Sequence, residues 1–196
     1  QQQQLYERSP YNVVRLILGK IIPGDSPQEN RYTRARRDFD AWREQGILRG
    51  DPAPSVTVIE HSFEHDGHTA RRLGFLALLQ LDEAGRSSVL RHEETLAAPK
   101  ADRTKLLEAV PANLSPIFCV YPDAGAAVQA SLEQTCRNAP SWTTAAIGAE
   151  QVRVWIVTDP AVIGEIQRRL SSVNVLIADG HHRFEVAYAN RSRYGA

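Results

Sequence analysis

The strongest constraint on the fold is a pair of β-rich stretches that flank a turn signal. Residues 56–63 and 71–81 are rich in β-branched and apolar residues, and the tripeptide HDG (residues 65–67) lies between them. An Asp-Gly pair in this setting predicts a β-hairpin. A second hairpin is predicted in residues 143–159, with Gly148 near its turn. Because a hairpin joins antiparallel neighbours, part of the chain must form an antiparallel sheet.

Helix signals alternate with these hairpins. Apolar residues recur at helical spacing between Tyr32 and Trp42, and Gly46 is the expected stop. Further helices are predicted at residues 1–9, 99–110, 123–137 and 159–170, and from His181 onward. Strands are predicted at residues 11–18, at 116–121 as a buried strand, at 173–179, and in a short stretch that ends near Arg91. This order predicts an α+β fold in which a mixed sheet and hairpins combine with helices.

Length and composition indicate a domain of ordinary size. The chain has 196 residues, of which 42% are hydrophobic, so it can bury a core. It contains no methionine, even at position 1, and we therefore expect a fragment of a longer protein. We interpret residues 1–196 as a single α+β domain that is incomplete at both ends.

The charge balance indicates which kinds of partner are expected, and the cysteine content indicates the redox state of the cell compartment. The 23 basic residues balance the 23 acidic ones, which gives no support to a nucleic-acid partner. No apolar run is long enough to span a bilayer. Cys119 and Cys136 could pair, but the simpler interpretation is two reduced thiols in a cytoplasmic protein. His61, His65 and His68 could bind a metal, although such histidines are more commonly polar residues of a turn and a strand face.

The segment NVLIADGHHRFEVAYANRSR, residues 174–193, carries the clearest functional signal. A strand that ends at Asp179 and passes directly into a helix leaves backbone N–H groups free at the helix start, and these favour an anion. Gly180 allows a close approach to the backbone. Arg183 could bind phosphate oxygens, and His181 or His182 could donate to phosphate or act as a general base. Asp179 could hold Mg²⁺ or orient a hydroxyl group.

Two alternatives to phosphate binding stay open for this segment and rank behind it. In the first, Asp179 is a plain N-cap of the helix, which leaves the two histidines and the arginine unexplained. In the second, the histidines bind zinc, but adjacent helical residues point about 100° apart, so His181 and His182 do not converge on one ion. A positive cluster at a helix start opposes the dipole, and such local conflicts are typical of functional sites.

Three blocks of the sequence carry a family resemblance. They are SPYNVVRLILGK, RHEETLAAPKADRTKLLEAVPANLSPIF and LIADGHHRFEVAYANR, and they are spread over most of the chain. Together they resemble the domain-of-unknown-function family ten-fifteen, which is similar to the ParB/sulfiredoxin superfamily and its free-serine kinases. The resemblance implies a ParB/sulfiredoxin-like part with a family-specific insertion at about residues 19–170. Residues 171–196 would then form the strand-helix segment with the phosphate motif.

The resemblance and the residue types together imply the lining of a site. The residues expected to bind the nucleotide are Gly180, His181, His182, Arg183, His92, Thr95, Lys100, Arg103, Asn113 and Ser115. The candidate catalytic residues are Asp179, His182 and Glu93, with Asp102 as a further carboxylate for a metal or a hydroxyl and Asp179 as the Mg²⁺ ligand. The alternative is an exposed helix start with i,i+4 charges at PKADRTKLLE, followed by a loop. The catalytic carboxylate of the serine kinases lies upstream of the phosphate motif, and no residue here matches it by motif.

The resulting expectation is a nucleotide-binding protein that takes ATP or ADP with Mg²⁺. It would transfer the terminal phosphoryl group to a small hydroxyl metabolite, in which case positioning and charge neutralisation would do most of the catalysis. The alternative is a non-catalytic module that responds to nucleotide or serves an interaction, and a homodimer stays open. A sulfiredoxin-like reductase would need a cysteine near the phosphate motif, and Cys119 and Cys136 are both distant in sequence.

Overall fold

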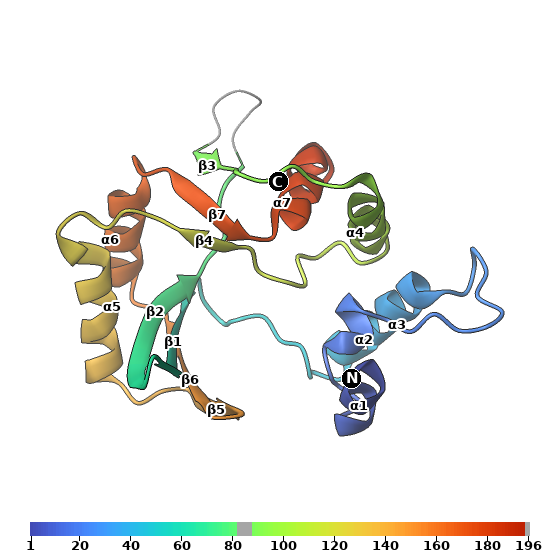
Figure 1. Ribbon diagram of the computed structural model, residues 1–196, viewed down its shortest axis with the longest axis horizontal. Helices are drawn as coiled ribbons and strands as arrows, with labels where there is room; N and C mark the ends of the chain where they lie inside the picture. The colour runs from blue at the N-terminus through green and yellow to red at the C-terminus, as the bar shows by residue number, and fades with distance from the viewer. Residues whose placement is uncertain (82–87, 195–196) are drawn as a thin grey trace. The chain divides into compact units, whose positions relative to one another are not determined.

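The computed structural model describes residues 1–81 and 88–194, which form two compact units (Figure 1). Each unit is assembled from separate stretches of the chain. The first unit contains Gln1–Gly50, Arg91–Cys119 and Ile177–Ala196. The second unit contains Asp51–Leu90 and Val120–Leu176.

The second unit is built on a four-stranded antiparallel sheet in the order β2–β1–β6–β5. Its strands are β1 (Val56–His65), β2 (His68–Leu76), β5 (Thr143–Ile147) and β6 (Glu150–Val157). Both predicted hairpins are confirmed, although β2 ends at Leu76 rather than at residue 81. Asp66 and Gly67 both have positive φ, 50° and 75°, as a tight type I′ hairpin turn requires.

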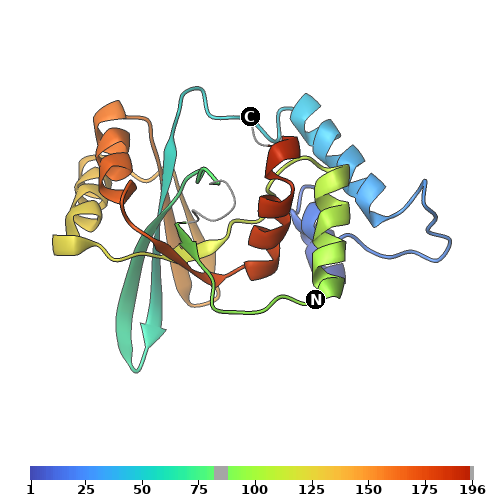
Figure 2. The ribbon, with the colours of Figure 1, turned by 90° about the horizontal axis from the view of Figure 1, so that it is seen from above.

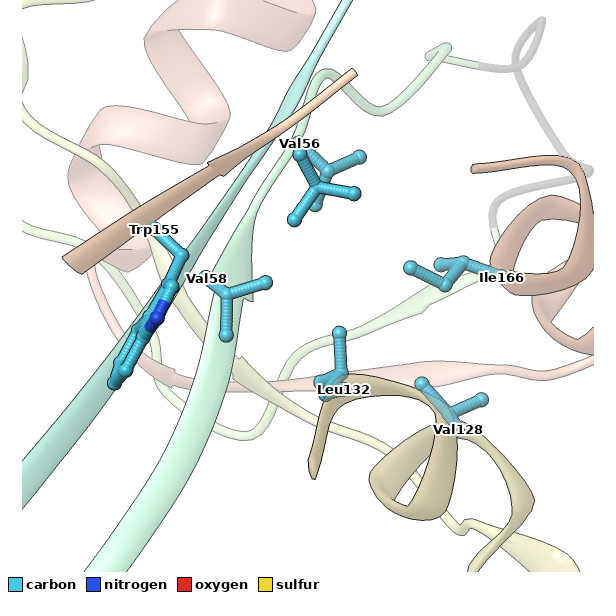
Figure 3. Close-up of a cluster of buried hydrophobic side chains, with 7 residues drawn as sticks. Val56, Val58, Val128, Leu132, Trp155 and Ile166 are labelled. Carbon is cyan, nitrogen blue, oxygen red and sulfur yellow. The ribbon is translucent and has the colours of Figure 1, made fainter. Parts of the chain in front are cut away.

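Two helices pack on this sheet and close its core. They are α5 (Ala127–Asn138), preceded by the 3₁₀ turn η1 (Ala124–Ala126), and α6 (Pro160–Leu170). Val58 and Trp155 from the strands meet Leu132 of α5 and Ile166 of α6 in one buried cluster (Figure 3). Asp159 caps α6 by accepting from the backbone N–H of Ala161 at 2.8 Å, as the Asp-Pro start predicts.

A buried carboxylate holds three strands of this sheet together. Glu60 on β1 is 2% exposed. It accepts from Arg71 of β2 at 2.8 Å and from Nε of Arg153 of β6 at 2.8 Å. Arg71 also binds Glu133 of α5 at 2.8 Å. The central position of β1 makes this arrangement possible, because it places one cationic partner on each side of Glu60.

The first unit is helical. It contains α1 (Gln2–Arg8), α2 (Val14–Ile17), α3 (Arg31–Glu44), α4 (Ala97–Ala109), α7 (His181–Ala189) and α8 (Arg191–Tyr194). Helix α3 packs against α2 and α4, and α4 packs against α7 (Figure 2). Asn30 opens α3 with a capping box shared with Thr33, and Gly46 follows its end at a φ of 69°.

The strand predicted at residues 11–18 is wrong, because the segment contains the short helix α2. Asn12 Oδ1 accepts from the backbone N–H of Val14 at 3.1 Å and starts the turn. Val14 and Leu16 are buried where α2 packs against α3. This burial outweighs the β-propensity of the segment, since that propensity mainly reflects how side chains pack on a sheet.

Three short strands form a second sheet in the order β3–β7–β4. They are β3 (Val89–Leu90), β4 (Phe118–Val120) and β7 (Val175–Asp179), and β3 runs parallel to β7. The strand predicted at residues 116–121 is confirmed as β4, but its expected burial is wrong, because Phe118 and Val120 are each 45% exposed. Helices combined with an antiparallel and a mixed sheet confirm the α+β class.

Two further expectations concern the whole chain. Cys119 and Cys136 are both free thiols. Within residues 1–81 and 88–194, none of the helices has both the length and the apolar character that a membrane span requires.

Candidate functional site

The strand-to-helix junction predicted at Asp179 is present, and Asp179 is not the residue that caps its helix. Strand β7 ends at Asp179 and helix α7 begins at His181, so Gly180 is the N-cap residue. Gly180 has a φ of 104°, a conformation that glycine adopts readily. Among the described residues, no side chain caps α7. The interpretation of Asp179 as the N-cap is therefore wrong, and its carboxylate instead binds Arg183 one turn further on.

Arg183 lies across the start of α7. Its guanidinium binds the carboxylate of Asp179 and donates to the backbone carbonyl of Pro116. A Cβ atom at Gly180 would lie 2.9 Å from Nη2 and 3.1 Å from Cζ of Arg183. The positive φ favours glycine at position 180, whereas the close contact involves only the end of a flexible arginine side chain, which can shift.

His181 is the buried member of a small cluster at the same junction. It is 3% exposed, its Nδ1 lies 3.3 Å from Oε2 of Glu93, and its ring meets the ring of His92 edge-on at 4.6 Å. The Nε2 atom is buried and has no hydrogen-bond partner among the described residues. The structure therefore brings His92 and Glu93 to the helix start, as the family resemblance implied.

His182 is committed to a backbone contact. Its Nε2 accepts from the backbone N–H of Leu96 at 3.0 Å. Leu96 is the N-cap residue of α4, so the imidazole satisfies a donor at the start of that helix. An accepting Nε2 requires the neutral imidazole with its proton on Nδ1.

Glu185 is a central residue that was not predicted from the sequence. Its carboxylate accepts from the hydroxyl of Thr95 at 2.5 Å and pairs with Lys100 at 3.2 Å and Arg91 at 3.4 Å. The hydrogen bond from Thr95, followed by those partners, lowers the pKa of Glu185 below its usual value. The signal that could have found it is its position four residues after His181, on the same helix face.

A shallow depression between α4 and α7, here called the α4–α7 hollow, gathers four of the predicted residues. Arg103, Asn113, Ser115 and Arg183 line it, together with apolar side chains that include Leu106 and Val186. The predicted residues thus fall into three groups. Thr95 and Lys100 meet at Glu185, and Arg103, Asn113, Ser115 and Arg183 line the hollow. The others, apart from Asp102, gather around the start of α7.

Comparison with known proteins places the chain in a family. The model of a family described as "Protein of unknown function (DUF1015)" matches residues 1–195. The chain belongs to the DUF1015 family. No curated protein and no solved structure matches this DUF1015 chain. Its relationship to the ParB/sulfiredoxin superfamily stays a prediction.

Asp102 does not join the site of this DUF1015 chain. Its carboxylate accepts from Arg31 at 2.5 Å and from the hydroxyl of Tyr32 at 2.7 Å, and so ties α4 to α3. Arg103, the next residue, donates to the backbone carbonyl of Ile17 at 3.1 Å while also lining the hollow.

The described residues of this chain do not by themselves form a complete metal site. Among the described residues of this DUF1015 chain, no group of three or more His, Cys, Asp or Glu side chains could hold an ion. His61 of the first hairpin, which was considered as a metal ligand, instead contacts Glu150 at 2.6 Å.

A single carboxylate such as Asp179 suits Mg²⁺ only when phosphate oxygens and water complete the coordination. The residues present therefore fit a magnesium ion that arrives with a nucleotide.

Proposed function

We propose that this DUF1015 chain binds a nucleotide, ATP or ADP with Mg²⁺, through its phosphates at the start of α7. The observation that carries the proposal is the guanidinium of Arg183 lying over Gly180 at a helix start that no described side chain caps. Free backbone donors, the positive end of the helix dipole and a forked cation together favour a phosphate group. The cytoplasmic location, the ParB/sulfiredoxin relationship and a homodimer belong to this proposal as expectations.

Exchange of partners at Arg183 explains how phosphate would enter. The side chain of Asp179 is 73% exposed, so its ion pair with Arg183 contributes only about 0–1 kcal/mol. A phosphate can therefore replace Asp179 at the guanidinium at small cost. The released carboxylate would then serve the Mg²⁺ ion that accompanies the phosphates.

Transfer of phosphate to a small hydroxyl metabolite is the catalytic extension of this proposal. A substrate hydroxyl would then need a base, and each candidate has another role. Asp179, once released from Arg183, would serve Mg²⁺, Nε2 of His182 accepts from Leu96, and Glu93 lies against His181. These contacts favour the second candidate function, a module that binds nucleotide and changes its assembly or contacts without transferring phosphate.

Titration of the chain with ATP, ADP and CTP in the presence of Mg²⁺ tests the binding proposal. We expect Arg183→Gln to weaken binding about ten-fold or more, because it removes a charge-assisted contact to phosphate. Lys105→Gln on α4 removes the same charge from an exposed position and should bind like the parent chain. Equal affinity of Arg183→Gln and Lys105→Gln, or no binding of any nucleotide, contradicts the proposal.

Mass spectrometry separates the two candidate functions. A pool of hydroxyl metabolites is incubated with the chain and Mg²⁺-ATP, and new phosphorylated species are sought. Phosphorylated products that disappear in Arg183→Gln support transfer. Nucleotide binding without any product supports the non-catalytic module.

A further inference from the structure

We propose that the α4–α7 hollow is a second anion site, which takes a carboxylate or phosphate group on a small ligand with a short apolar part. The inference rests on the proposed function for the first ligand and gives the chemical class of the second. The lining of the hollow differs from that of the helix start, because Arg103, Asn113 and Ser115 line it and Arg183 is the residue of 179–183 that it includes.

The hollow carries a positive charge. Two arginines, Arg103 and Arg183, face the hollow, and none of the described residues that line it is acidic. The carboxylate that pairs with Arg103 is Asp102, at 3.8 Å, and it already accepts from Arg31 and Tyr32. Each guanidinium has five N–H donors, so both arginines keep donors for a ligand.

The walls of the hollow strengthen the effect of this charge. Leu106, Leu107, Leu114, Val186 and Ala187 surround the polar groups. Apolar walls lower the local dielectric, so an anion interacts more strongly with the two guanidinium groups than it would in water. The same walls can accommodate a short hydrocarbon part of the ligand.

Hydrogen-bonding groups complement the cations. Asn113 offers an amide that can donate or accept, and Ser115 offers a hydroxyl. Two guanidinium groups, an amide and a hydroxyl match the acceptor oxygens of a carboxylate or a phosphate.

Size decides which part of a ligand fits. The hollow has a volume of about 50 Å³, and on the same measure one buried water molecule needs about 10–15 Å³. The hollow can therefore hold a chemical group the size of a few water molecules. A carboxylate or a phosphate group satisfies this limit, whereas a nucleobase with its ribose does not.

Arg183 connects the hollow to the helix start. It lies over Gly180 and also lines the hollow, so one guanidinium can contact both anions. The second ligand would then be held beside the nucleotide phosphates. Phosphate transfer needs two reactants held side by side in this way.

Two-dimensional NMR of the full chain tests this inference with inorganic phosphate and acetate as separate probes. The backbone amides of Asn113 and Ser115 report on the hollow, and those of Gly180 and His182 report on the helix start. We expect at least one probe to shift the Asn113 and Ser115 signals in a saturable manner. The probe with the lower Kd identifies whether the natural group is a phosphate or a carboxylate.

Variants assign the binding to the hollow. Arg103→Gln should weaken the Asn113 response about ten-fold, whereas Lys105→Gln should leave it unchanged. Asn113→Asp keeps the size of the side chain and places a negative charge in the hollow, so it should abolish binding even if Arg103→Gln fails to fold. No saturable shift with either probe, or equal Kd values for Arg103→Gln, Asn113→Asp and Lys105→Gln, overturns the inference.

Failure of this inference differs from failure of the proposed function. If Mg²⁺-ATP shifts Gly180 and His182 while neither small anion shifts Asn113, the second site is wrong and the nucleotide site stands. If phosphate or acetate binds at Asn113 while Mg²⁺-ATP leaves Gly180 and His182 unchanged, the hollow is an anion site and the nucleotide proposal is wrong.

Discussion

Nε2 of His182 accepts a hydrogen bond from the backbone N–H of Leu96 across 3.0 Å, and this contact joins the starts of two helices. Leu96 precedes α4, whereas His182 lies in the first turn of α7. A side chain that ranks as a candidate base in the sequence therefore has a structural partner. This relationship predicts a loss of stability when the imidazole is removed.

We expect His182→Phe to lower the free energy of unfolding by about 1–2 kcal/mol, because it leaves the N–H of Leu96 without its acceptor. Urea denaturation measures the change, and hydrogen exchange of the Leu96 amide should accelerate. His65→Phe in the exposed turn of the first hairpin is the control and should change neither quantity. Unchanged exchange at Leu96 in His182→Phe would show that the contact contributes nothing.

Glu185 should make stability depend on pH. Its pKa is lowered in the folded chain, chiefly by the hydrogen bond from Thr95. Its contribution is therefore complete above the ordinary glutamate pKa and is lost as the pH falls through the lowered folded value. We expect Glu185→Gln to cost about 1–2 kcal/mol at neutral pH and much less in acid.

Urea denaturation between pH 3 and pH 7 checks this expectation. The curve of stability against pH should be flatter for Glu185→Gln than for the parent chain. Glu44→Gln, an exposed replacement at the end of α3, should keep the parental slope. Parallel curves for all three proteins contradict the role given to Glu185.

Replacement of Glu60 should lower the free energy of unfolding more than replacement of an exposed charge in the second unit. Its replacement by glutamine leaves Arg71 and Arg153 without the carboxylate between them. The lost charge-assisted hydrogen bonds should cost about 1.5–3 kcal/mol, because the side chains of Arg71 and Arg153 are 47% and 45% exposed and stay hydrated. Thermal or urea denaturation measures this loss. Glu64→Gln, further along β1 and exposed, should lose far less.

Gly180→Ala separates two reasons for the glycine. Alanine would be strained at a φ of 104° and would also collide with Arg183. Gly24 has a similar φ of 93° with no described atom within 4 Å, so Gly24→Ala measures strain alone. We expect a loss of about 1–2 kcal/mol for Gly24→Ala and a slightly larger one for Gly180→Ala, because the guanidinium is the end of a flexible side chain and must move aside.

A double variant isolates the collision. Adding Arg183→Ala to Gly180→Ala removes the side chain that a new Cβ would meet, so the two effects should not add. Denaturation of the two single variants and the double variant gives the coupling energy. If the losses of stability in the two single variants add up to the loss in the double variant, the guanidinium of Arg183 does not meet a Cβ at position 180 in solution.

Local signals in the sequence were sufficient for much of the fold. The turn at Asp66 and Gly67 and the start of α6 at Asp159 depend on residues adjacent in the chain, and both were predicted. The segment 11–18 was mispredicted because burial of Val14 and Leu16 against α3 is a tertiary effect. A propensity for strands cannot contain that information.

In the candidate site, too, local features were predictable from the sequence and long-range contacts were not. The helix start at Gly180 was predictable from the strand, glycine and helix order. The partners of Glu185, in contrast, come from residues 91–100, far away in the chain. Contacts over such separations depend on the folded arrangement and leave no periodic pattern in the sequence.

The divided assembly of the first unit has a consequence for the order of synthesis. Residues 91–119 and 177–194, which together supply the site, are separated by a stretch that belongs to the second unit. A nascent chain that has emerged only to residue 176 already contains every segment of the second unit, but it lacks Gly180, Arg183 and Glu185. Since domains fold largely in the order in which they leave the ribosome, the second unit can mature first. Premature termination shortly before α7 would then release a chain with a folded sheet and no binding site.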